Sequence, residues 1–249
     1  MLRSYRDQAI VLRSYKLGEA DRIVILLGRK SGQIRAVAKG VRRTTSKFGA
    51  RLSSFNLVEL QLHRGRNLDV VTQAETLMAY ADKMGEDYAA FTNAKLMVET
   101  IQKLTDGHDD ADPGQFDLLH GALHALATRR RPAALTGAAF LLRSMALEGW
   151  QPALAHCVAC SEQAGLEFFS PEGGGVFCTG CAPAGATHLQ AGTAALMAAL
   201  LAGDWESALA APQALWDEAH QLSGAWAQWH LEQRLRSLPF ATAGGSLEN

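Results

Sequence analysis

The sequence contains no hydrophobic run long enough to cross a membrane. Its longest apolar stretch, residues 191–203, falls well short of the roughly 18–20 residues that span a bilayer. The first 13 residues carry Arg3, Arg6, Asp7 and Arg13 among their apolar residues, so they lack the continuous apolar core of a signal peptide. We therefore expect an intracellular, cytoplasmic protein with no membrane partner.

The motifs of common catalytic sites are also absent. The sequence has no Gly-x-x-x-x-Gly-Lys-Ser/Thr phosphate loop, no His-Glu-x-x-His helix and no Gly-x-Ser-x-Gly elbow. Its eight histidines are scattered along the chain. These absences predict a protein that is not an enzyme and that has no small-molecule substrate.

Cysteine is missing everywhere except in residues 157–181. There, Cys157, Cys160, Cys178 and Cys181 form two Cys-x-x-Cys pairs separated by 17 residues. This spacing is typical of a zinc site, because each pair presents two thiolates and the intervening segment folds the pairs together as a hairpin. Four thiolates leave no open position for water, so the sequence predicts one structural zinc ion. Redox-active pairs and inert buried thiols are the alternatives.

Acidic residues are scarce in the first third of the chain. Residues 1–80 hold 15 lysines and arginines against 6 acids, a net charge of +9, whereas the remaining residues hold 9 against 19, a net of −10. The whole chain carries −1. This asymmetry indicates an N-terminal domain that meets a polyanion and a second part that meets something else.

Five short apolar runs precede residue 78, at residues 9–12, 23–27, 34–38, 57–62 and 68–72. Turn-forming residues separate them, and in the fourth run Val58, Leu60 and Leu62 alternate with Leu57, Glu59 and Gln61. Such alternation is typical of a half-buried strand. Five short strands predict a small closed barrel of the OB-fold kind.

The period then changes to that of helices. Met84, Tyr88, Phe91, Ala94, Val98, Ile101 and Leu104 recur at steps of three and four, which predicts an amphipathic helix. Further helices are expected near residues 116–126, 132–148, 192–202, 204–210 and 212–238. The fold class is therefore α+β and multidomain. The expected divisions are a nucleic-acid-binding barrel at 1–80, helical segments at 81–150 and 191–240, an inserted zinc element at 151–190 and a flexible tail at 241–249.

One loop concentrates positive charge. Residues 39–51 hold five basic residues and no acid, interspersed with Gly, Thr and Ser. Such a loop is typical of contacts with a phosphate backbone, although a solvated surface is the alternative. Aromatic residues are few in the first 79 positions, so binding should read base sequence poorly. The predicted DNA contacts are Arg22, Arg35, Lys39, Arg42, Arg43, Lys47, Arg51, Arg64 and Arg66.

Three segments together resemble the RecO family of recombination mediators. They are Gly-Glu-Ala-Asp-Arg-Ile-Val at 18–24, Gly-Gln-Ile-Arg-Ala-Val-Ala-Lys-Gly-Val-Arg-Arg at 32–43, and Leu-Glu-Gly-Trp-Gln-Pro-Ala-Leu at 147–154. The resemblance implies an OB-fold, a helical domain and a zinc element. It implies binding of single- and double-stranded DNA, annealing of complementary strands, loading of RecA onto strands coated by single-strand-binding protein, and RecR as a partner. A nucleoid-associated location in the cytoplasm follows from these roles.

The resemblance also implies that the helical domain binds the acidic, apolar C-terminal tail of single-strand-binding protein. A hydrophobic groove with a basic rim suits such a tail. Basic residues are few between positions 103 and 234, so the expected rim is Arg129, Arg130, Arg131 and Arg143. Two other functions remain open on the residues alone: an RNA-binding OB-fold protein, and a non-catalytic protein adaptor with a structural zinc.

Overall fold

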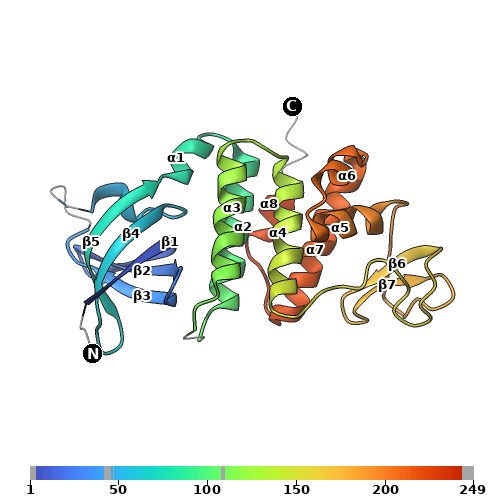
Figure 1. Ribbon diagram of the computed structural model, residues 1–249, viewed down its shortest axis with the longest axis horizontal. Coiled ribbons are helices and arrows are strands. Elements are labelled where there is room, and N and C mark those ends of the chain that lie inside the picture. Colours follow the sequence, from blue (N-terminus) through green and yellow to red (C-terminus); the bar gives the residue numbers. More distant parts are fainter. Residues whose placement is uncertain (1–3, 42–45, 47, 108–109, 243–249) are drawn as a thin grey trace. The chain divides into compact units, whose positions relative to one another are not determined.

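The computed structural model describes residues 4–41, 46, 48–107 and 110–242, and it divides the chain into two compact units, Met1–Arg130 and Arg131–Asn249. The first unit consists of a closed barrel and three helices, and the second of helices and a small three-stranded sheet (Figure 1). The predicted α+β fold class is confirmed. Within the described residues, no helix combines the length and the apolar character that a membrane span requires.

The barrel contains five strands in the order β1-β2-β3-β5-β4. Strand β1 is long enough to pair with two neighbours: its first half pairs with β4 and its second half with β2, both antiparallel. A short parallel pairing of β3 with β5 closes the remaining gap. The strands are β1 (Ser4–Leu17), β2 (Asp21–Gly28), β3 (Gly32–Ala38), β4 (Leu57–His63) and β5 (Asp69–Met78).

Alternation along the strands builds the barrel core, as the sequence predicts. Val58, Leu60 and Leu62 of β4 all point inward and are fully buried, while Glu59 is exposed. The short 3-10 helix η1 (Gly49–Leu52) adds Leu52 to the same core. Removing these side chains from water supplies the main driving force for the barrel, at about 25 cal/mol per Å² of apolar area.

The helices of the first unit are α1 (Tyr80–Met84), α2 (Tyr88–Leu104) and α3 (Pro113–Ala127). The sequence predicted one helix from about residue 84, but α1 precedes it and ends at Gly85, whose φ of 58° favours glycine. The Asp87 carboxylate then caps α2 by accepting from the backbone N–H of Ala90. Tyr88 and Phe91, which share the spacing of the apolar face, are exposed. The prediction of one continuous apolar face is therefore wrong at these two positions.

The second unit packs α4 against α5 and α7. The predicted helix over 212–238 is too long, because α7 ends where Glu232 adopts the left-handed conformation. The Gln228 side chain accepts from the backbone N–H of Leu235 just beyond that end. The helices are α4 (Ala133–Leu147), α5 (Thr193–Ala202), α6 (Trp205–Ala210), the 3-10 helix η2 (Gln213–Leu215), α7 (Trp216–Leu231) and α8 (Leu238–Thr242).

Between α4 and α5 the chain forms the small sheet β7-β6-β8, with β6 (Leu166–Ser170), β7 (Gly175–Cys178) and β8 (Thr187–His188). Strands β6 and β7 make the hairpin that the cysteine spacing predicts. Gly175 lies against the segment before the first cysteine pair, where an added Cβ would lie 2.1 Å from the carbonyl oxygen of Ala153. This close approach ties that segment to the hairpin.

Candidate metal centre and nucleic-acid interface

Two backbone turns bring the four cysteines together. Cys157 and Cys160 lie in the loop before β6, and Cys178 and Cys181 lie at the end of β7 and just after it. The Cys157 carbonyl accepts from the backbone N–H of Ser161 at 2.9 Å, and the Cys178 carbonyl accepts from that of Cys181 at 3.1 Å. Each pair therefore sits on a tight turn whose two thiols point to the same side.

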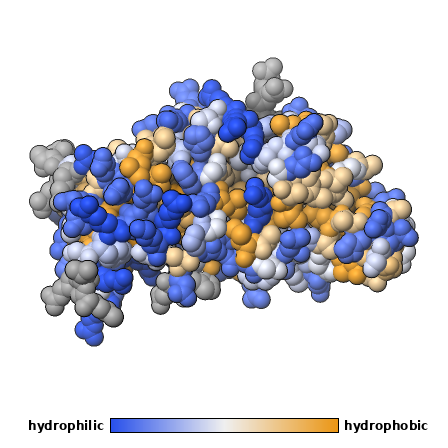
Figure 2. Space-filling view, in the orientation of Figure 1, coloured by the Kyte–Doolittle hydropathy of each residue, from blue (hydrophilic) through white to orange (hydrophobic). Residues whose placement is uncertain are grey.

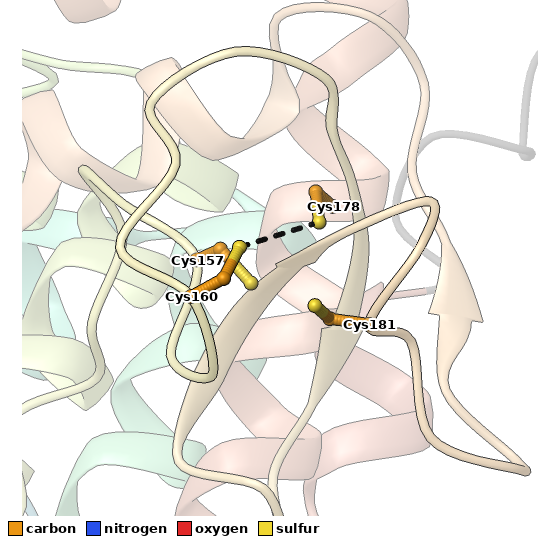
Figure 3. A group of neighbouring side chains, drawn as sticks. All are labelled: Cys157, Cys160, Cys178 and Cys181. Atoms are coloured by element: carbon orange, nitrogen blue, oxygen red, sulfur yellow. Dashed lines mark hydrogen bonds between the residues drawn. The ribbon is translucent and has the colours of Figure 1, made fainter.

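The four sulfur atoms converge on one point (Figure 3). All four Sγ atoms lie within 4.8 Å of one another, and those of Cys160 and Cys178 are 3.7 Å apart. A tetrahedral ion with metal–sulfur bonds of about 2.3 Å requires sulfur atoms about 3.8 Å apart. The cluster therefore has the size of a four-thiolate coordination shell and could hold a metal ion.

Local electrostatics also fit a bound cation. A hydrogen bond from the backbone N–H of Cys178 is the main cause that lowers the pKa of the Cys157 thiol to about 6. Hydrogen bonds to the sulfur atoms of Cys178 and Cys160 raise the pKa of the Cys181 thiol to about 12. Four thiolates so close together repel one another, so a bound cation would allow all four to ionise and would release their protons.

The described DNA-contact candidates lie on the barrel. Arg35 and Lys39 are exposed and share one face of β3 and the turn after it. Arg22 lies on β2, opposite Lys16 of β1 on one side and Ala38 of β3 on the other. These positions bring Arg22 and Lys39 to the end of the barrel where the basic loop begins, whereas Arg35 lies in the middle of β3, opposite Ile25 of β2.

The remaining predicted DNA contacts lie in different parts of the first unit. Arg51 is exposed on η1. Arg64 and Arg66 are exposed in the turn between β4 and β5, where the Arg64 guanidinium lies 4.9 Å from the ring of Tyr5. Arg42, Arg43 and Lys47 lie outside the described residues. At the base of their loop, the backbone N–H of Gly40 donates to the Asp21 carboxylate at 2.8 Å.

The four predicted rim arginines are not all alike. Arg129 pairs with Asp87 at 3.5 Å in the first unit, and Arg130 is exposed at the end of that unit. In the second unit, the Arg131 guanidinium covers the ring of Trp205 at 3.8 Å. Arg143 of α4 is half-buried, with its guanidinium beside Gly203, the residue that ends α5.

Two basic side chains that the sequence prediction left out lie beside aromatic rings. Arg13 on β1 lies over the ring of Tyr15, two residues further along the strand, at 4.7 Å. Lys95 on α2 lies 5.5 Å from the ring centroid of Phe91, one helical turn earlier. The sequence does carry a signal for both pairs, because residues two apart on a strand, or four apart on a helix, share a face. The pair of Phe91 and Lys95 was missed because Phe91 was assigned to the buried face of its helix.

The surface character of the two units differs in the view of Figure 2. Hydrophilic side chains cover most of the barrel surface visible there, and apolar side chains gather on the second unit. Exposed Leu147, Trp150 and Trp229 contribute to the apolar surface of the second unit. The division agrees with the charge asymmetry of the sequence.

Comparison with known proteins identifies the family. A family model described as Recombination protein O N terminal matches residues 1–80, and one described as Recombination protein O C terminal matches residues 85–239. The DNA repair protein RecO of Cutibacterium acnes (strain DSM 16379 / KPA171202) is 46% identical over 243 residues, which are 95% of this chain and 98% of that protein. The chain belongs to the RecO family.

The RecO family consists of non-catalytic recombination mediators. The first RecO model ends two residues after β5, and the second begins at the glycine between α1 and α2. The second RecO model includes the whole cysteine cluster. The sequence therefore predicted the family correctly from three short segments.

Proposed function

We propose that this RecO protein is a DNA-binding recombination mediator in DNA repair. In this role it binds single- and double-stranded DNA, anneals complementary strands and, with RecR, helps to load RecA onto strands coated by single-strand-binding protein. The basic barrel is the observation on which the proposal rests, because a member of the RecO family carries exposed arginines and lysines on a closed barrel. The site of this work is the nucleoid within the cytoplasm.

Contacts with phosphates explain why such a protein serves many sequences. Side chains that contact phosphates position a strand without reading its bases. The proposed contacts are the nine basic residues of the barrel and its loop that the sequence singled out. Binding should therefore weaken strongly as salt rises, because each contact releases counterions from the strand.

A strand-annealing assay tests the proposed function. The protein should accelerate annealing of complementary oligonucleotides, both bare and coated with single-strand-binding protein, because it neutralises the phosphates of the two strands as they meet. Fluorescence energy transfer between end-labelled strands measures the rate. No acceleration on either substrate would contradict the proposal. Equal competition by matched RNA would instead favour an RNA-binding role.

We further propose that the metal is one zinc ion with a structural role. A tetrahedral set of four sulfur ligands suits zinc or an iron–sulfur centre. With all four positions taken by thiolates, a zinc ion has no place for a reactive water and contributes folding free energy instead. Metal analysis distinguishes zinc from iron directly.

For the tail of single-strand-binding protein, we propose a site around the corner between α5 and α6. Arg131 and Arg143 reach this corner from two different segments, one over Trp205 and the other beside Gly203. Leu209 on α6 is exposed and offers apolar surface. Cations next to apolar and aromatic surface match the chemistry of an acidic, apolar peptide.

Tail binding should depend on these two arginines. Replacing Arg143 by glutamate, or Arg129, Arg130 and Arg131 together by alanine, should weaken binding of a labelled tail peptide about tenfold or more, since hydrogen bonds to charged groups contribute about 1.5–3 kcal/mol. Fluorescence anisotropy at several salt concentrations measures the affinity.

A change of opposite sign provides the control. Glu206→Gln removes an exposed acid from the same corner and should strengthen tail binding slightly. If both arginine variants bind the tail peptide with unchanged affinity, these arginines do not form the rim. The tail itself would remain a proposed partner.

A further inference from the structure

A row of side chains joins β1 to α2 in the first unit. It runs from the ring of Tyr15 to the Arg13 guanidinium at 4.7 Å, then to the Lys95 ammonium, and then to the ring of Phe91 at 5.5 Å. Helix α2 packs on β1, which brings the two cations together. The Lys95 ammonium also lies 5.1 Å from the ring of Phe55, which is buried behind Phe91.

The two cations in the middle of this row have no acidic partner among the residues that the structure describes. Within the described part of the chain, neither Arg13 nor Lys95 forms an ion pair. Burial, and then the positive charge of Arg13, lower the pKa of Lys95. Two like charges, one of them partly removed from water, cost free energy unless an anion lies beside them. The row therefore favours a bound anion.

Aromatic rings at both ends of the row are open to solvent. Tyr15 is 39% exposed and Phe91 is 38% exposed. Tyr15 projects from β1 and Phe91 from α2. A flat ring beside a cation suits a nucleobase next to its phosphate, and base–aromatic stacking is tolerant of sequence.

The row is continuous with the proposed DNA surface. Arg13 lies opposite Ile25 of β2, and Ile25 in turn lies opposite Arg35 of β3. Residues that lie opposite one another on paired strands share a face of the sheet, so Arg13 and Arg35 are on the same face. Adjacent strands are about 4.8 Å apart, so about 10 Å of barrel surface separates Arg35 from Arg13.

We propose that Tyr15, Arg13, Lys95 and Phe91 form a stacking platform for single-stranded DNA, with a phosphate held by the two cations and a base on each ring. This proposal rests on the DNA-binding function proposed above. It adds base stacking to a surface otherwise made of phosphate contacts. It also gives single strands an advantage over duplexes, whose bases are already stacked and paired.

Two pairs of full-length variants test the platform. Tyr15→Leu and Phe91→Leu keep apolar surface but remove the rings, and each should weaken binding of a thymidine oligonucleotide about fivefold or more. Their binding to an abasic strand of the same length should not change. Arg13→Gln and Lys95→Gln should each weaken binding to both strands, and the two changes together should flatten the log–log salt slope by about 0.7, the value for one phosphate contact.

Matched controls lie on the second unit. Trp229→Leu removes a half-exposed ring and Arg234→Gln removes one exposed positive charge, and both should leave the preference for the base-containing strand intact. Because Phe91 packs edge-on against Phe55 at 5.4 Å, its variant is checked for folding by thermal melting. Tyr15→Leu answers the question by itself if the Phe91 variant does not fold.

The possible outcomes separate the two proposals. A wild-type protein that binds neither strand contradicts the DNA-binding function itself. A wild-type protein that binds both strands equally, with Tyr15→Leu unchanged, overturns only the platform. An acidic peptide that displaces the thymidine strand from the wild type, but not from the Lys95→Gln variant, would also overturn the platform. That result would favour a peptide site.

Discussion

Replacing Cys178 by serine is expected to release the metal ion and to unfold the region from residue 149 to about residue 188. A serine hydroxyl cannot supply a thiolate, and three sulfur ligands leave the coordination shell incomplete. Zinc binding contributes about 10–16 kcal/mol to folding in small zinc domains, far more than a short three-stranded sheet can replace. This sheet pairs β6 with β8 through two residues only, so we expect a bound ion to supply most of its stability.

Three measurements follow the expected loss. Elemental analysis should fall from about one zinc per chain to almost none, proteolysis should cut first between residues 149 and 188, and the thermal midpoint should decrease. Val158→Ser introduces a serine at an exposed position in the same turn and keeps all four thiolates, so it should retain the metal. Wild-type protein with freely titratable thiols and no metal would contradict the zinc centre.

DNA binding is expected to suffer most from changes in the basic loop. If Lys39, Arg42, Arg43, Lys47 and Arg51 each neutralise one phosphate, their joint contribution to the log–log salt slope is about −3.5, at roughly 0.7 per contact. Changing Arg42, Arg43 and Lys47 to alanine should therefore flatten the slope by about 2. Over a fourfold increase in salt, the wild type should then lose roughly 20-fold more affinity than the variant.

The loop variant needs a control with the same change in net charge. Lys83 and Lys103 lie on α1 and α2, and Arg234 lies between α7 and α8. Changing all three to alanine should leave the slope almost unaltered. The loss in the loop variant should be similar for strands of different sequence, because phosphates carry no base information. If the loop variant keeps the wild-type slope, the main phosphate contacts are not in the loop. They would then be expected at Arg22, Arg35, Arg64 and Arg66 on the barrel.

Local patterns in the sequence predicted much of this molecule. The alternating residues at 57–62 predicted both the strand and its buried face, because a strand in a small barrel has one face in the core. The cysteine spacing predicted that the four sulfur atoms converge, since two Cys-x-x-Cys pairs joined by a hairpin bring four thiols to one point. Three short segments sufficed for the RecO family.

The errors arose where one local signal had two interpretations. Tyr88 and Phe91 keep the helical spacing, yet in the first turns of α2 the buried positions include Ala90, Asn93 and Ala94, so the core face is rotated away from the two rings. The spacing of the last helix continues to residue 238, but the backbone turns at Glu232. Strand β1 was predicted at residues 9–12 only, because its ends mix polar and apolar residues where two different strands pair with it.

The sequence by itself determined which side chains can carry charge, ligate a metal or fill a core, since these properties belong to residues and to their spacing along one element. Only the tertiary structure decided which elements meet. The parallel pairing of β3 with β5 closed the barrel, and the packing of α2 on β1 placed Lys95 next to Arg13. Contacts between residues 82 positions apart leave no periodic trace in the sequence, because each residue fits its own element equally well without the other.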